Sequence, residues 1–183
     1  MPLTMPAALR DLGKRRINRV PSPVLARSTP WLVVMVGSLC PLLPLVASAP
    51  VVPPFGFLFL VAWLQLRPGL FPVWAGLPLG LFDDLFSGQP FGSAVLLWSV
   101  AVIVVDYIET RFPWRGFAQD WLLAAAAFAF CLLGGLVLAN LAGGSSAVLT
   151  IVPQLIVSIF AYPLAARLVG ALDRFRLIPI REL

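Results

Sequence analysis

The sequence predicts an all-α integral membrane protein, a bundle of about six transmembrane helices. Composition is the first observation behind this prediction. Of the 183 residues, 60% are hydrophobic and only 11% are charged, and the mean hydropathy is +0.96. A soluble domain carries about 25% charged residues. Length is the second: a spanning helix needs about 20 mostly apolar residues, so this chain has room for about six spans with short loops.

The first half of the chain holds three apolar segments, after a basic tail at residues 1–28. They cover residues 31–49, 51–66 and 70–86. Prolines separate the first two, because proline cannot continue a helix. The turn Arg67-Pro68-Gly69 separates the second from the third. The second and third segments are short enough to form a re-entrant pair as an alternative to two full spans.

The second half holds three more segments, at residues 91–108, 121–141 and 148–170. Residues 87–90 form the turn before the fourth span, and Pro90 suits the first turn of the helix that follows. A polar loop at residues 111–120 and a Gly-Gly-Ser-Ser turn at residues 143–146 separate the remaining spans. The predicted bundle covers residues 29–175, and residues 176–183 form a second tail.

Every basic residue falls on the side of the N-terminus in this arrangement. Six of the 13 lie in the first 27 positions, and the others lie in the Arg67 turn, the 111–120 loop and the C-terminal end. Short basic loops stay in the cytoplasm during insertion. We therefore expect both termini in the cytoplasm, and we interpret the net charge of +5 as a topology signal and not as a nucleic-acid surface.

The sequence contains few residues suited to catalysis. It has no histidine, and it shows no phosphate-binding glycine loop, nucleophile elbow or metal-ligand spacing. We expect no catalytic residue, metal or cofactor, and a protein that is not an enzyme. The polar side chains Gln65, Asn140 and Gln154 lie within spans and are expected to bond across helices.

Asp83 and Asp84 stand out among the eight acidic residues. The other six lie among the cytoplasmic basic residues, whereas these two lie near the outer end of the third span. A charge at membrane depth is costly unless it faces protein or water. At 100° per residue, Gly76, Gly80, Asp83 and Asp84 share one face of a helix. Glycines on one face let another helix approach closely, and the acids can then accept N–H groups at the start of the fourth span, from Gln89 and Phe91.

Three interpretations of the aspartate pair remain open. The pair ends a helix at the outer water interface, or it ties the third span to the fourth, or it binds a ligand or proton.

The stretch from Gly80 to Gly92 resembles the signature of the bacterial rod shape-determining family MreD. That signature has a glycine, an aspartate four residues later, an apolar pair, a glycine and a later glycine. In this register the aspartate is Asp84, and Gly88 and Gly92 are the two following glycines. Pro53 or Pro54 opening the second span, and Tyr162-Pro163 followed by Arg167, also resemble the family. Phe55 departs from it, because an acidic or amide residue often follows that proline.

The resemblance implies a non-enzymatic scaffold of the cell-elongation machinery in the bacterial inner membrane. Such a protein acts in lateral peptidoglycan synthesis by binding the bitopic protein MreC, and through it the MreB filament and the wall synthases. The family is also thought to resemble the substrate-binding membrane subunits of energy-coupling-factor transporters. This makes a small-molecule carrier subunit the alternative, and an enzyme acting on a lipid-linked substrate a third, poorer one.

A scaffold with short loops must act through the lateral face of its bundle. Small residues let a partner helix dock there. The third span offers Gly76 and Gly80, and the fifth offers Gly134 and Gly135. We expect these glycines to pack against the chain's own helices or against the transmembrane helix of MreC.

Overall fold

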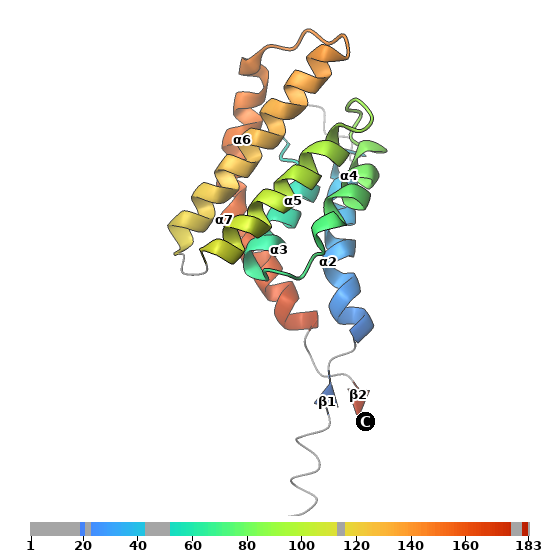
Figure 1. The fold of residues 1–183 in the computed structure, drawn as a ribbon, viewed down its shortest axis with the longest axis vertical. Coiled ribbons are helices and arrows are strands. Elements are labelled where there is room, and N and C mark those ends of the chain that lie inside the picture. Colours follow the sequence, from blue (N-terminus) through green and yellow to red (C-terminus); the bar gives the residue numbers. More distant parts are fainter. Residues whose placement is uncertain (1–18, 21–22, 43–51, 113–115, 177–180, 183) are drawn as a thin grey trace, which may run out of the picture.

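The computed structural model describes residues 19–20, 23–42, 52–112, 116–176 and 181–182. Within these residues the structure is all-helical apart from one pairing of two-residue strands (Figure 1). The described ranges contain six α-helices: α2 (Pro23–Ser38), α3 (Phe55–Leu66), α4 (Gly76–Asp84), α5 (Ser93–Arg111), α6 (Phe117–Leu141) and α7 (Val152–Arg176). Short 3-10 turns occur at η1 (Cys40–Leu42), η2 (Val73–Ala75) and η3 (Val148–Ile151).

The short helix α3 lies at the centre of the bundle. It contacts α2, α5, α6 and α7, and eight of its 12 residues are buried. The helix α4 packs against α5 and α2 on the outside of this arrangement (Figure 1). A helix that is apolar on all sides, as α3 is, belongs in such a buried position.

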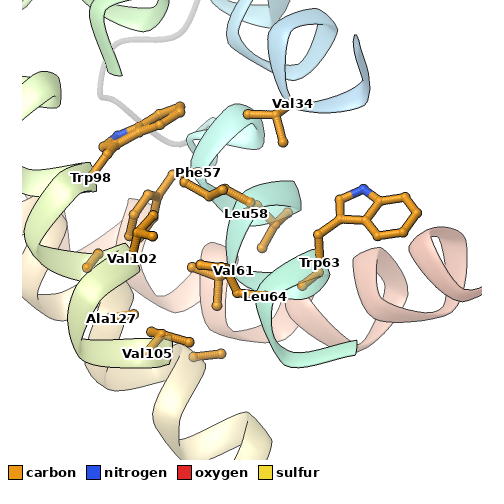
Figure 2. Packing of buried hydrophobic residues seen from close by; sticks show 14 of the residues in the cluster. Val34, Phe57, Leu58, Val61, Trp63, Leu64, Trp98, Val102, Val105 and Ala127 are labelled. Carbon is orange, nitrogen blue, oxygen red and sulfur yellow. The ribbon is translucent and has the colours of Figure 1, made fainter. Parts of the chain in front are cut away.

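Large aromatic side chains fill the interior around α3. Phe57 contacts both Trp98 of α5 and Phe128 of α6, with ring centroids 5.6 Å and 5.9 Å apart. Figure 2 shows Phe57 and Val61 of α3 turned toward Val102 of α5, while Trp63 leaves α3 in another direction. Interiors of this kind are close-packed, so each of these side chains helps to hold the helices in register.

In the part of the chain that the structure describes, three helical segments are long and apolar enough to cross a membrane: Ser93–Arg111, Phe117–Leu141 and Val148–Arg176. They match the predicted fourth, fifth and sixth spans and extend each of them toward the basic end of the molecule. The helix α3 has 12 residues, which corresponds to about 18 Å at 1.5 Å per residue. The length of this helix is well below the hydrocarbon thickness of about 30 Å.

The predicted third span becomes α-helical only at Gly76. Pro72 is extended, and the chain then passes through η2 into the nine-residue α4. Pro78 lies in the first turn of α4, where its missing N–H removes no hydrogen bond. These two prolines explain why the helix is shorter than the apolar segment, a length that suits the re-entrant alternative better than a full span.

The first helix begins earlier than predicted. We expected a tail up to residue 28 and a span from Trp31, but α2 begins at Pro23 and ends at Ser38. Proline is favoured in the first turn of a helix, and Pro23 supplies that signal. The remainder of the predicted span, beyond η1, lies outside the described residues.

The first and last described elements meet at one end of the bundle. The strand β1 (Arg19–Val20) pairs antiparallel with β2 (Arg181–Glu182) below the start of α2 and the end of α7 (Figure 1). The turn after α3 and the end of α5 lie toward the same end. The described basic residues therefore gather mainly at one end, as the sequence pattern predicts.

Candidate functional site

The helices α4 and α5 contact each other backbone to backbone through two glycines. A Cβ atom on Gly76 would lie 2.5 Å from the Cα of Ser99, and one on Gly80 would lie 2.6 Å from the carbonyl oxygen of Ala94. No real Cβ atom tolerates such a distance, so any side chain at either position would push the helices apart. Glycine is thus required by the close approach of α4 to α5.

The carboxylate of Asp84 caps the N-terminus of α5. It accepts hydrogen bonds from the backbone N–H groups of Gly92 (2.9 Å), Ala94 (2.9 Å) and Val95 (3.2 Å). The hydroxyl of Ser93 donates a fourth bond, 3.3 Å long. The first N–H groups of a helix have no partner within the helix, and a negative charge there also interacts favourably with the helix dipole. Asp84 therefore acts as a cap supplied by the preceding helix.

This geometry distinguishes the two aspartates. Asp84 is 6% exposed. The sequence predicts N–H donors at Gln89 and Phe91, whereas the observed backbone donors lie slightly later, at Gly92, Ala94 and Val95. Asp83 is half-buried, and the backbone N–H groups that begin α5 donate to its neighbour. Of the three interpretations, a tie between the third and fourth segments describes what Asp84 does.

Gly88 and Gly92 shape the turn between the two helices. Their φ angles are +68° and +92°, in the left-handed region that side chains with a Cβ disfavour. Gly92 immediately precedes α5 and also donates its N–H to Asp84. The turn thus brings the chain back so that α5 starts directly beside the end of α4.

The two adjacent glycines of α6 pack against α5 and the turn that precedes it. A Cβ atom on Gly134 would lie 2.5 Å from a methyl group of Leu97 in α5, and one on Gly135 would lie 3.2 Å from the side-chain oxygen of Gln89. All four glycines with a predicted packing role thus contact other parts of the same chain. A partner helix would have to dock on a different face.

A partly buried ion-pair cluster lies at the basic end, and the sequence does not predict it. Asp173 of α7 accepts two bonds from Arg67, 3.1 Å and 2.8 Å long, and one of 2.8 Å from the Nε of Arg176. The guanidinium of Arg176 lies 5.2 Å from the ring centroid of Trp63 and bonds to the carbonyl of Ala26. The hydrogen bonds to Asp173 raise the pKa of Arg67, so this arginine remains charged.

The cluster joins the start of α2, the end of α3 and the end of α7. Asp173 lies among basic residues in the sequence, and nothing there distinguishes it from the other acidic residues of the basic end. Arg67 was the sequence signal that could have indicated an ion pair. It is the only basic residue between positions 28 and 110, and it lies in a short turn.

The predicted polar bonds between helices are confirmed for Gln65, whereas Gln154 bonds to a non-helical segment of the chain. The amide of Gln65 donates to the carbonyl of Asp120 at the start of α6 and accepts a bond from the hydroxyl of Tyr162. The amide of Gln154 donates to the carbonyl of Val52, ahead of α3. The prediction for Asn140 is wrong. Its side chain bonds to the backbone of Ser146 and closes the loop after α6.

Comparison with known proteins identifies no relative. Neither a family model, nor a curated protein, nor a solved structure matches this chain.

Proposed function

We propose that this chain is an inner-membrane scaffold of the MreD type, which binds the transmembrane helix of an MreC-like protein in the cell-elongation machinery. One observation carries the proposal. The residues on which the resemblance rests, Gly80, Asp84, Gly88 and Gly92, form a single structural unit. Gly80 permits the close approach, Asp84 caps α5, and the other two glycines make the turn.

This unit strengthens the resemblance because its parts depend on one another. The four residues are spaced by four along the chain. The close approach at Gly80 and the turn at Gly88 and Gly92 together bring the start of α5 to the carboxylate of Asp84. If the match to the signature were a coincidence, there would be no reason for its four residues to form one structural unit. The unit is also internal, so it serves to build the bundle while the partner is held elsewhere.

The filled interior supports the scaffold over a carrier subunit. A carrier needs a pocket with polar groups placed to orient its ligand. The centre of the described bundle is instead occupied by Trp98, Phe57 and Phe128, each less than 2% exposed. A membrane-embedded interior of this composition suits a protein that acts through its outer faces.

We propose a bacterial inner-membrane location with both termini in the cytoplasm, which assigns the basic end of the molecule to the cytoplasmic side. Cysteine labelling from outside, after replacement of Cys40 and Cys131, tests this orientation. A cysteine at Ser145, in the exposed loop after α6, is expected to react. A cysteine at Gln119, exposed at the other end of α6, is expected to remain unlabelled. The reverse pattern would invert the topology.

Partner binding is tested by co-purification with an MreC-like protein from mild detergent. Bulky substitutions at Gly76 or Gly134 are unsuitable, because both positions are packed inside the chain. Tryptophan substitutions at Leu81 of α4, Leu133 of α6 and Leu164 of α7 instead alter three exposed faces. We expect one of the three to reduce capture by about tenfold, equivalent to about 1.4 kcal/mol, while the other two bind as the wild type does.

Cell shape provides the functional control for this experiment. Depletion in a rod-shaped host is expected to give round cells without loss of small-molecule uptake. If no MreC-like protein is captured by the wild type and depleted cells keep their shape, the scaffold proposal is wrong. A specific loss of uptake would then favour the carrier subunit.

A further inference from the structure

The ion-pair cluster at the basic end carries an excess positive charge at its surface. One carboxylate, that of Asp173, faces two guanidinium groups. Arg176 binds Oδ1 and is buried, with a side chain only 6% exposed. Arg67 binds Oδ2, and its side chain is 51% exposed. The buried pair is balanced, so the charge of Arg67 is left at the surface.

Two further arginines flank this cluster. Arg27 follows Ala26, whose carbonyl accepts the bond from Arg176, and Arg174 follows Asp173. Both are exposed. The start of α2, the turn after α3 and the end of α7 therefore each present a guanidinium group around one buried carboxylate.

Three aromatic side chains, here called the aromatic layer, follow Arg27 and Arg67 along the chain. Trp31 is one helical turn beyond Arg27 in α2, and its ring contacts Phe71 and Trp74, with centroids 5.5 Å and 5.8 Å away. Trp74 is 59% exposed. In α2 and in the segment after α3, a basic residue is followed four positions later by an aromatic one: Arg27 by Trp31, and Arg67 by Phe71.

We propose that this surface binds the headgroup of an anionic phospholipid. A guanidinium group recognises a phosphate through paired N–H donors. Indole rings prefer the boundary between headgroups and acyl chains. In a lipid leaflet the phosphate lies outside the glycerol. The arginines would meet the phosphate, and the exposed indole of Trp74 would meet the glycerol region beneath it. Free phosphate shares the phosphate chemistry but offers nothing to the aromatic layer, so the lipid is the better occupant.

This inference is independent of the scaffold proposal and needs only that the bundle lies in a membrane. The test is native mass spectrometry of the purified full chain in non-ionic detergent, titrated with phosphatidylglycerol or phosphatidylcholine. The wild type is expected to retain phosphatidylglycerol preferentially. Arg67→Gln and Arg27→Gln are each expected to weaken its binding about fivefold, since one basic residue near an anionic lipid contributes about that much.

Matched variants separate a site from a general charge effect. Arg111→Gln removes the same charge at the exposed end of α5 and is expected to leave binding unchanged. Arg27→Gln leaves the bonds to Asp173 intact, so it remains informative if Arg67→Gln is unstable. Trp74→Leu is expected to weaken lipid retention without changing the protein's charge.

The opposite results would overturn the proposal. Equal retention of the two lipids, or equal losses for Arg67→Gln and Arg111→Gln, would show that no headgroup site exists. Displacement of phosphatidylglycerol by millimolar inorganic phosphate, with Trp74→Leu binding like the wild type, would show that the surface recognises free phosphate instead.

Discussion

Replacing Asp173 by alanine is expected to lower the unfolding free energy by about 3–5 kcal/mol. The change leaves Arg176 buried without its carboxylate, and removing one partner of a buried ion pair costs about this much because the other charge remains uncompensated. The bonds from Arg67 are lost as well. Reversible unfolding of the purified protein in mixed detergent micelles, followed by the helical circular dichroism signal, measures the difference.

The matched control is Arg67→Ala, which removes the exposed partner and leaves the buried pair in place. An exposed ion pair contributes about 0–1 kcal/mol, and the side chain of Arg67 is half exposed. We therefore expect a small loss for this variant. Similar losses for Asp173→Ala and Arg67→Ala would mean that burial of Arg176 does not determine the stability of the cluster.

Replacing Asp84 by alanine is expected to cost about 1–3 kcal/mol, as for hydrogen bonds lost to a charged group. Three backbone N–H groups at the start of α5 would lose their acceptor, two of them within 2.9 Å of the carboxylate. The same micellar unfolding assay measures this loss. We also expect faster proteolysis within residues 85–92, because the turn would no longer be tied to α5.

Asp83→Ala is the control for this experiment and is expected to be milder, since the start of α5 donates to Asp84. Asp84→Asn should fall between the two alanine variants, because an amide oxygen still accepts hydrogen bonds but carries no charge. Equal tolerance of Asp83→Ala and Asp84→Ala, in stability and in cell shape, would return the pair to the simpler interpretation of a helix end at the water interface.

The local features of the candidate site could be predicted from the sequence. Helical periodicity places Gly76, Gly80 and Asp84 on one face. The donors that Asp84 binds lie only eight to 11 residues further along the chain. A short turn leaves such neighbours little choice of position, so pattern and spacing were informative. What periodicity missed was the pair of prolines, Pro72 and Pro78, that delays α4 within its apolar segment.

Composition and charge pattern by themselves determined that this chain is a bundle of apolar helices with its basic residues mainly at one end. Only the tertiary structure decided that the short α3 lies at the centre and that Arg67 meets Asp173, 106 positions away. It also decided that Arg176 reaches Ala26, 150 positions away. The physical reason is the solvent. In an apolar sequence every helix face is compatible with lipid, so hydrophobicity does not say which faces meet. Close packing around Phe57 and Trp98, and the need to pair a buried charge, make that choice.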